Sequence, residues 1–311
     1  MALDSGLVPA PLDFAYQREA ELFGVTWQGE PAVLRRIVQK VDDRDEKVLA
    51  DRRWVHEFLS ALAPSGFPAP RPLPAFGGQS VVLHEGDVWE LVSFVPGRSV
   101  EWAGPPLLES IGQLMARYHE VAQTFRPAAQ RPGALDAQGT VEVLIANDID
   151  SADIYGGELP RALELALVLA DELDRLGPQE ELVIHGDFTT NNVVVEGEPP
   201  LATGVIDFAL AHWEAAEAEL GYGLWQSGRP QRGAPSLQQE RVVALVRGYG
   251  GARRLRPQAA RAVPVYAMGR GLQMMAKRVR QGAPWGASLD QVAWTAAHLD
   301  DLERALTPLV G

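Results

Sequence analysis

The sequence predicts an α+β chain with two lobes: a small N-terminal lobe with an antiparallel sheet and one helix, and a larger, mainly helical C-terminal lobe. Strand-like segments surround a single helical pattern in the first third of the chain, and helical patterns dominate after residue 105. The length of 311 residues also exceeds the usual size of one hydrophobic core. We place the first lobe at residues 1–92, a connecting segment at 93–97 and the second lobe at 98–311.

The elements of the N-terminal lobe follow from apolar runs that turn residues separate. Residues 31–38 read as a strand, and 80–84 and 88–94 read as an antiparallel pair around a glycine-containing turn. Between them lies a helix that Asp42 or Asp43 can cap. Its apolar residues recur at helical spacing: Val48, Val55, Phe58, Leu59 and Leu62.

The C-terminal lobe is predicted to be a series of helices with a few short strands. Residues 126–159 are rich in Pro, Gly, Ala and Asp without a periodic pattern, and we expect them to form an irregular insertion on the substrate side. The helices are expected at 105–125, 160–177, 215–226, 237–249, 257–281 and 288–308.

One stretch carries three oxygen-bearing side chains at spacings that suit phosphoryl transfer. A short apolar run at 182–184 leads into a loop that begins with Asp187 and ends at Asn192, and a further strand at 203–206 delivers Asp207. Phosphoryl transfer needs an acid-base group beside the attacking hydroxyl and oxygen ligands for Mg²⁺. Asp187 suits the first role, and Asn192 and Asp207 suit the second because magnesium prefers oxygen and takes only one or two protein carboxylates.

These residues resemble the motifs of the aminoglycoside phosphotransferase superfamily, which includes choline kinases, fructosamine kinases and one class of homoserine kinases and shares the protein-kinase-like fold. His185-Gly186-Asp187, followed by Asn192, is similar to its catalytic motif, and Ile206-Asp207-Phe208 is similar to its metal-binding motif. The resemblance is firm between 91 and 225. It implies a two-lobed small-molecule kinase that binds ATP between a nucleotide-binding lobe and a catalytic and substrate-binding lobe.

The resemblance also implies a role for each matching position. Asp187 would be the catalytic residue, and Asn192 and Asp207 would hold magnesium. On the nucleotide side, Arg35 would bind the phosphates, and backbone groups in the hinge 93–97 would bind the adenine, at Ser93, Phe94 and Val95.

Two features depart from the family pattern. Val55 or a close neighbour occupies the helix position where the family offers a glutamate to the phosphate-binding cation, and we expect surface roles for His56 and Glu57. The segment between Gly24 and Gly29 lacks the glycine-rich pattern of a phosphate loop, so we expect a short hairpin turn there.

Four further residues near the motifs are expected to have structural roles. His185 is expected to orient the catalytic loop rather than to act as a base, and Glu219 resembles a carboxylate that braces this loop. His119 is expected to pack within its helix, and His212 to lie in an exposed loop.

The amino-acid composition indicates where the protein resides and which partners it can bind. The chain has no cysteine, which excludes disulfides and thiol chemistry, and neither an export signal nor a membrane span is found, so we expect a cytoplasmic protein. A net charge of −13 argues against nucleic acid as a partner and is compatible with a cationic acceptor, although acidity also serves solubility. The oligomeric state is not predicted.

The acceptor is a small molecule with a hydroxyl group, and its identity stays open. An amino-sugar antibiotic or a similar amine-bearing compound is our first expectation. A small metabolite such as homoserine or choline is the alternative. The absence of a glycine-rich phosphate loop and of the helix glutamate leaves another functional class as an alternative, a nucleotide-binding protein without transferase activity.

Overall fold

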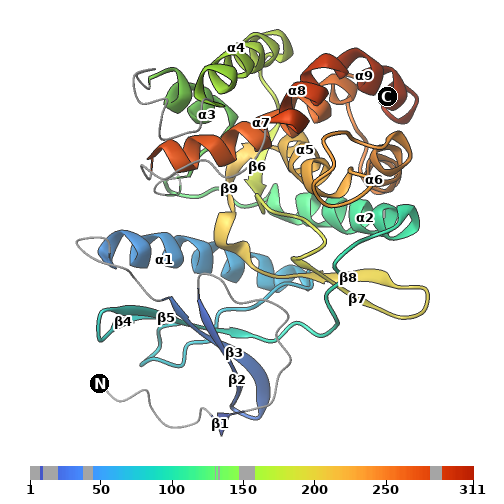
Figure 1. Ribbon diagram of the computed structural model, residues 1–311. Coiled ribbons are helices and arrows are strands. Elements are labelled where there is room, and N and C mark those ends of the chain that lie inside the picture. Colours follow the sequence, from blue (N-terminus) through green and yellow to red (C-terminus); the bar gives the residue numbers. More distant parts are fainter. Residues whose placement is uncertain are drawn as a thin grey trace.

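The chain has the two-lobed α+β architecture that the sequence predicts, with the sheet lobe below and the helical lobe above (Figure 1). The computed structural model describes residues 8–9, 20–37, 45–129, 131, 134–146, 158–280 and 289–311. The predicted caps Asp42 and Asp43 lie outside the described residues.

The small lobe contains a five-stranded antiparallel sheet with the order β1-β2-β3-β5-β4. The predicted hairpin turn is confirmed at Gln28 and Gly29, where both residues have positive φ. In β3, Arg35 lies directly opposite Glu90 of β5, which brings a cation and a carboxylate to the same face of the sheet. The strands are β1 (Val8–Pro9), β2 (Glu21–Trp27), β3 (Glu30–Ile37), β4 (Val81–His84) and β5 (Asp87–Ser93).

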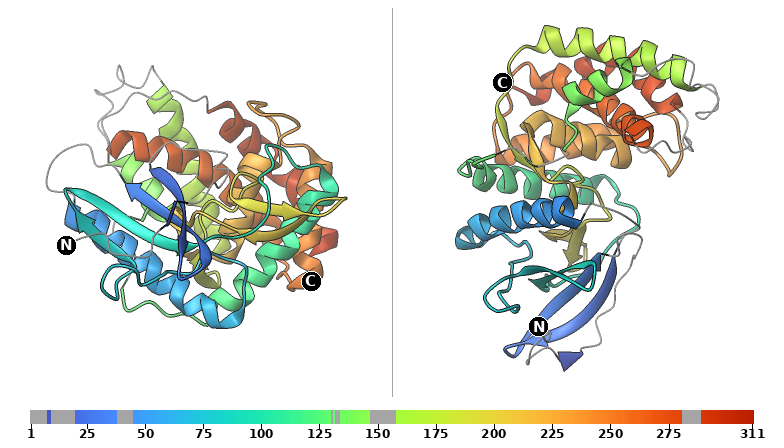
Figure 2. Two further views of the ribbon diagram at one scale, coloured as in Figure 1. Left: turned by 90° about the horizontal axis from the view of Figure 1, so that it is seen from below. Right: turned by 90° about the vertical axis from the view of Figure 1, so that its left-hand side faces the viewer.

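Helix α1 (Asp45–Leu62) lies between this sheet and the large lobe (Figures 1 and 2). Its apolar stripe includes Phe58, which is fully buried and contacts the ring of Tyr118 in the large lobe. Burial of this stripe removes apolar area from water on the large-lobe side, so one hydrophobic cluster continues from α1 into the large lobe. A short 3₁₀ turn, η1 (Ala63–Ser65), ends the helix.

The two lobes are joined by the segment between β5 and α2 (Pro105–Ala122). This segment pairs with the hairpin of β7 (Val193–Glu196) and β8 (Leu201–Val205), because Arg98 and Val195 exchange backbone hydrogen bonds of 3.1 and 2.9 Å. The hairpin therefore holds the connecting segment in place through backbone hydrogen bonds. The precise lobe boundaries at 92 and 98 stay a prediction.

The large lobe is built around α7 (Ala259–Arg280), which packs against five other helices (Figure 2). Its residues Met268, Leu272 and Met275 are fully buried in a second hydrophobic cluster. No helix in the described part of the chain combines the length and the apolar character that a bilayer crossing requires. The remaining helices are α4 (Glu158–Leu176), α5 (Ala216–Ser227), α6 (Gln239–Ala252), α8 (Asp290–Ala297) and α9 (Leu299–Leu306), followed by the 3₁₀ turn η4 (Thr307–Leu309).

Two expectations about these helices are wrong. The segment 126–159, expected to be irregular, contains α3 (Ala137–Ile145), which Asp136 caps by accepting a 2.7 Å hydrogen bond from the Gly139 N–H. The predicted single helix at 288–308 is two helices that break at His298, where φ is −119° and ψ is 18°. Tertiary packing stabilises α3, whose Val141 and Leu144 are buried in the second cluster.

Candidate active site

The catalytic loop begins where β6 (Glu181–Ile184) ends. Gly186 has φ +74°, and a Cβ at this position would lie 2.4 Å from the carbonyl oxygen of Leu210. Only glycine tolerates both this conformation and this close approach. The chain can therefore turn sharply between β6 and Asp187.

The side chain of His185 is fully buried and holds the loop, as the sequence predicts. Its Nε2 donates to the carbonyl oxygen of Ile206 at 2.9 Å, and its Nδ1 accepts from the Asp187 N–H at 3.2 Å. Both nitrogens are engaged within the protein. His185 therefore links the catalytic loop to the end of β8 and is not placed as a base.

Glu219 of α5 braces the same loop from below, which confirms its expected contact. Its fully buried carboxylate accepts hydrogen bonds from the backbone N–H groups of His185 and Gly186, the second at 3.1 Å. His119 of α2 lies 3.9 Å from Glu219 and is bonded to the hydroxyl of Tyr249 at 2.7 Å. Burial lowers the pKa of His119 below its ordinary value, so this ring packs as a neutral group.

Asp187 and Asn192 are brought together at the mouth of the loop. The Asn192 side-chain nitrogen donates to Oδ2 of Asp187 at 2.8 Å and to its carbonyl oxygen at 2.9 Å. The Asn192 Oδ1 takes no part in these bonds and can serve as a metal ligand. The backbone carbonyl of Asn192 accepts from the Ile206 N–H at 2.8 Å, which brings Asp207 beside the loop.

Asp207 adopts the left-handed conformation with φ +61° and ψ 67°. This conformation is uncommon for a residue other than glycine, and such strain concentrates at functional sites. The Asp207 side chain is 46% exposed, and its Oδ1 lies 3.5 Å from Nη1 of Arg35. The structure therefore brings together Arg35 from the small lobe and Asp207 from the large lobe, as the predicted site requires.

Glu90 supplies the carboxylate that the sequence did not locate. Arg35 forms an ion pair with Glu90 at 3.0 Å, and His56 of α1 contacts the other oxygen of Glu90 at 3.2 Å. Nδ1 of His56 is bonded to the Ser80 hydroxyl at 2.8 Å. The expected surface role of His56 is therefore wrong, because its side chain is only 6% exposed, whereas Glu57 is exposed as expected.

The ion pair determines the charge state of Glu90. Burial alone would raise the pKa of this carboxyl group, but the charges of Arg35 and Arg52 and the hydrogen bond with His56 hold it well below its ordinary value. Glu90 is thus a buried carboxylate that holds Arg35 in place and is ionised at neutral pH.

The hinge offers fewer backbone groups to adenine than the sequence indicates. The Ser93 N–H donates to the carbonyl of Arg71 at 2.9 Å, and the Phe94 N–H donates to the carbonyl of Pro31 at 3.1 Å. Of the three predicted positions, Val95 is the one whose N–H finds no acceptor among the described residues. Adenine binding at Ser93 to Val95 stays a prediction, and it is narrowed to the Val95 N–H and the carbonyl oxygens.

Arg270 of α7 is a site residue that the sequence reasoning missed. Its Nη2 donates to Oδ1 of Asp187 at 2.9 Å, and its guanidinium lies over the Tyr222 ring, 5.3 Å from the centroid. Nη1 donates to Oε1 of Gln273. A detectable signal existed, since Arg270, Gln273 and Lys277 recur at i, i+3 and i+7, which places them on one face of the helix.

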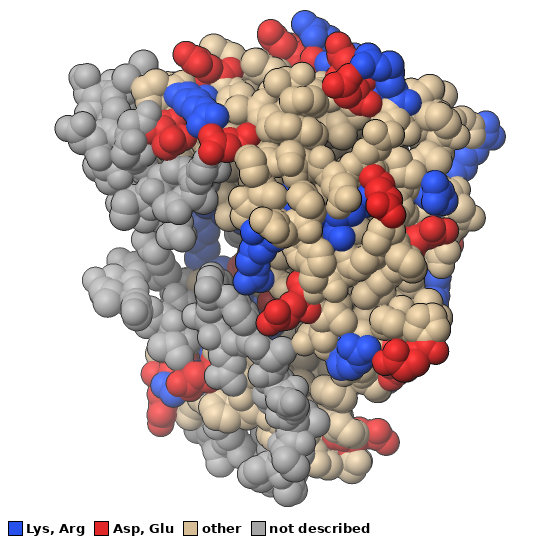
Figure 3. Space-filling view, turned by 45° about the vertical axis from the view of Figure 1, so that its right-hand side comes forward, with Lys and Arg blue, Asp and Glu red and all other residues tan. Residues whose placement is uncertain are grey.

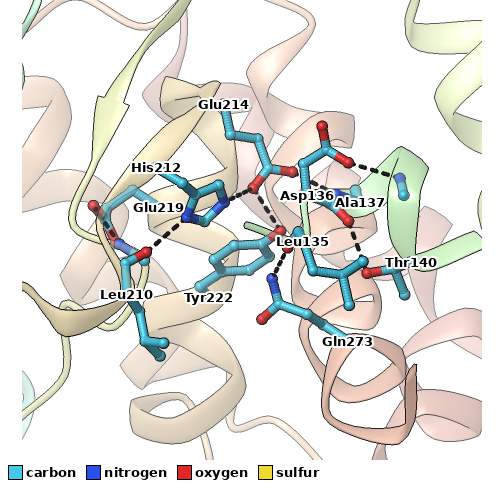
Figure 4. A network of polar contacts seen from close by, with 12 residues as sticks. Leu135, Asp136, Ala137, Thr140, Leu210, His212, Glu214, Glu219, Tyr222 and Gln273 are labelled. Carbon is cyan, nitrogen blue, oxygen red and sulfur yellow. Dashed lines mark hydrogen bonds and ion pairs between the residues drawn. The ribbon is translucent and has the colours of Figure 1, made fainter. Parts of the chain in front are cut away.

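Figure 4 shows a buried polar network around Glu214 that includes Tyr222, the residue whose ring Arg270 overlies. The Glu214 carboxylate accepts from Nε2 of His212 and from the Tyr222 hydroxyl, each at 2.8 Å, and from the Ala137 N–H at 2.8 Å. Nδ1 of His212 lies 2.7 Å from the carbonyl oxygen of Leu210. His212 was expected in an exposed loop. It is instead buried in β9 (His212–Ala215), which pairs with β6.

The predicted magnesium ligands fit a metal that completes its shell with phosphate and water. Asn192 and Asp207 offer one amide oxygen and one carboxylate, both hard oxygen donors, at the facing ends of the loop and β8. Among the described residues no group of three or more His, Asp or Glu side chains could hold a metal by itself. The two residues therefore suit a metal ion that takes its other ligands from nucleotide phosphates and water.

Comparisons with known proteins agree with this geometry. The profile of the "Phosphotransferase enzyme family" matches residues 15–258, so the chain belongs to this family. The homoserine kinase of Methylobacillus flagellatus is 30% identical over 162 residues, which cover 51% of this chain and 47% of that protein. The homoserine kinase of Rhizobium meliloti is 25% identical over 223 residues, 70% of this chain and 64% of that protein. The matched region thus spans 47% and 64% of the length of these two relatives.

Solved structures share the whole fold. An amicoumacin kinase, solved in complex with AMP-PNP, Ca²⁺ and Ami, superposes with a TM-score of 0.64 at 16% identity, covering 99% of this chain and 92% of that one. The family resemblance and the protein-kinase-like fold that the motifs predict are confirmed.

Proposed function

We propose that this protein is an ATP- and Mg²⁺-dependent small-molecule kinase that transfers the γ-phosphate to a hydroxyl group. The observation that carries the proposal is the arrangement of Asp187, Asn192 and Asp207. The Asn192 side chain donates to Asp187 at 2.8 Å, and the Asn192 carbonyl accepts from the N–H of Ile206, the residue before Asp207, at 2.8 Å. These are the acid-base group and the oxygen ligands that phosphoryl transfer requires.

In this proposal each residue acts by position and charge. A carboxylate oxygen of Asp187 accepts the hydrogen of the attacking hydroxyl, so that the oxygen is aligned with the γ-phosphorus as the bond to the β-phosphate breaks. Arg35, held by Glu90, binds the nucleotide phosphates. Asn192 and Asp207 would hold magnesium, which when bound neutralises charge on the phosphates.

For the acceptor we propose a small hydroxylated amine. The amino-sugar antibiotic that the sequence reasoning preferred stays a prediction. The names of the two curated relatives favour the alternative, a homoserine-type metabolite.

A second candidate is a protein that binds nucleotide without transferring phosphate. The β2–β3 turn has only two residues and no glycine-rich pattern, and Arg270 already engages Asp187, which both favour this reading. Incubation with ATP, Mg²⁺ and a panel of amino-sugar and amino-alcohol acceptors, with ADP release and phosphorylated product followed, tests both. Acceptor-dependent product supports the kinase, and Mg²⁺-dependent ATP binding without product across the panel would favour the second candidate.

A further inference from the structure

Two donors from different parts of the chain hold the two oxygens of the Asp187 carboxylate. Nη2 of Arg270 on α7 donates to Oδ1 at 2.9 Å, and Nδ2 of Asn192 in the catalytic loop donates to Oδ2 at 2.8 Å. Rotation of the carboxylate would therefore break both bonds at once. An ionised carboxylate has about four lone-pair positions, so each oxygen of Asp187 keeps a position for the hydrogen of a ligand.

Arg270 is itself held by its neighbours. Its side chain is 10% exposed, and its guanidinium lies over the Tyr222 ring. Nη1 donates to Oε1 of Gln273, which lies one turn further along α7. The amide nitrogen of Gln273 donates to the carbonyl oxygen of Leu135, next to the residue that caps α3. Gln273 thus fixes Arg270 with one end of its amide and ties α7 to the start of α3 with the other.

The ring that Arg270 overlies is held by the buried network of Figure 4. The Tyr222 hydroxyl donates to Glu214 at 2.8 Å, and the same carboxylate oxygen contacts His212 at 2.8 Å. Burial and the charge of Glu214 raise the pKa of the Tyr222 hydroxyl well above its ordinary value, so this group keeps its proton and remains a donor. Residues of β9 therefore fix the ring on which the guanidinium lies.

From these contacts we propose that Arg270 and Gln273 are positioning residues, which hold the Asp187 carboxylate in the orientation that meets the acceptor hydroxyl. The proposal rests on the proposed kinase function and adds two residues to it. Figure 3 shows basic and acidic side chains close together at the hollow between the lobes, so a carboxylate there has more than one cation toward which it could turn. Alignment matters because a displacement of about 1 Å can cost about 10²-fold in rate.

Arg270→Met tests whether Arg270 positions Asp187 or masks it. Methionine keeps an unbranched side chain over the Tyr222 ring but removes the guanidinium. We expect kcat to fall by about 10²-fold while the Kd for AMP-PNP changes by less than ~2-fold. Arg270→Lys should lie between, because lysine keeps the charge but not the planar fork. If Arg270 instead masked Asp187, its removal would leave kcat unchanged or raise it, and either result overturns the proposal.

Gln273→Met and Gln291→Met form a matched pair. Both glutamines are buried in the large lobe and donate to a backbone carbonyl, Gln291 to that of Trp225 at 2.6 Å. Only Gln273 also accepts from Arg270. We expect kcat to fall by about 10-fold in Gln273→Met and to stay within ~2-fold of the unmodified value in Gln291→Met. Thermal unfolding of both variants shows whether a change in kcat merely follows a loss of folded protein, and equal kcat values would contradict the role of Gln273.

Two measurements separate this proposal from the kinase function on which it rests. ADP release and phosphorylated product, followed with ATP, Mg²⁺ and homoserine, 3-aminopropan-1-ol or kanamycin, give kcat and KM, and no product from the unmodified protein would count against the kinase function. Crystal structures of the same variants test the positioning without turnover. We expect one Asp187 conformer in the unmodified protein and in Gln291→Met, and a rotated or divided one in Gln273→Met. An unchanged Asp187 conformer in Arg270→Met overturns the proposal.

Discussion

Two arginine–carboxylate pairs face the cleft from opposite lobes, and they differ in how much water reaches the carboxylate. In the small lobe Arg35 pairs with Glu90, whose side chain is 3% exposed. In the large lobe Arg270 pairs with Asp187, whose side chain is 30% exposed. The arginines themselves are similarly protected, at 19% and 10%.

The difference in exposure agrees with different roles for the two carboxylates: Glu90 fixes Arg35 in place, and Asp187 is the proposed reactive group. Glu90 is enclosed by Arg35 and His56, so its oxygens are committed within the protein. The more exposed Asp187 retains lone pairs that a ligand can reach, although Arg270 and Asn192 each donate to it. An arginine–carboxylate pair therefore orients Arg35 in the small lobe, and in our proposal a second such pair positions Asp187 as the base in the large lobe.

The largest expected effect comes from removing the exposed carboxylate. Asp187→Ala should lower turnover by about 10²–10⁴-fold while ATP still binds, because positioned acid-base groups contribute on this scale. Steady-state ADP release and nucleotide titration measure the two quantities. Asp174→Ala, an exposed aspartate on α4, is the control. Near-normal turnover in Asp187→Ala would remove this residue from the mechanism.

Asp207→Asn tests the carboxylate that faces Arg35 across the lobes. The substitution keeps the shape but removes a charge beside the metal and the phosphates. We expect loss of transfer and weaker ATP binding only when Mg²⁺ is present, with little change in the thermal stability of the metal-free protein. Calorimetric titration of ATP with and without Mg²⁺ measures this. An equal loss of affinity in both conditions would show that Asp207 has a structural role instead.

Glu90→Gln tests whether the small-lobe pair is an anchor. Removing one partner of a buried ion pair costs up to about 3–5 kcal/mol in the free energy of unfolding. Arg35 loses its 3.0 Å carboxylate partner in the sheet, and the half-exposed Asp207 at 3.5 Å compensates its charge less well. We also expect the KM for ATP to rise, since Arg35 loses its fixed position, with a smaller change in kcat. Denaturant unfolding and steady-state kinetics give these values, with the exposed Glu57→Gln on α1 as control. Unchanged stability and KM would contradict the anchor role.

The smallest effect concerns His119, which lies beside the buried brace Glu219 beneath the catalytic loop. Burial lowers the folded-state pKa of His119. Below about pH 6.5 the unfolded chain therefore binds a proton at this ring that the folded chain does not bind. The contribution of neutral His119 to the free energy of unfolding is therefore present above this pH, and it is lost as the pH falls toward the folded-state pKa.

Denaturant unfolding between pH 7.5 and 5.5 should show that His119→Gln loses less stability than the unmodified protein. The difference is at most about 1.4 kcal/mol per pH unit, which is the linkage limit for one proton. Parallel pH curves for the two proteins would exclude His119 as a contributor.

The sequence could predict which residues of the proposed site lie close together where they are near one another along the chain. Asp187 and Asn192 are five residues apart, and Asp207 follows at the end of the next hairpin, so strand geometry alone brings them near one another. The supporting roles of His185 and Glu219 could also be predicted, since both side chains accept hydrogen bonds from the loop's own backbone.

The sequence by itself thus determined the two-lobed fold, the family and the loop that carries the proposed catalytic groups. Only the tertiary structure showed which distant residues contact Arg35 and Asp187. Glu90 reaches Arg35 through strand pairing across 55 residues, and Arg270 reaches Asp187 from a helix 83 residues away. Contacts of this kind depend on the register of a sheet and on the rotation of a packed helix, which local patterns do not fix. Packing also determined α3 and β9, because the buried face of α3 and the pairing of β9 with β6 exist only in the folded lobe.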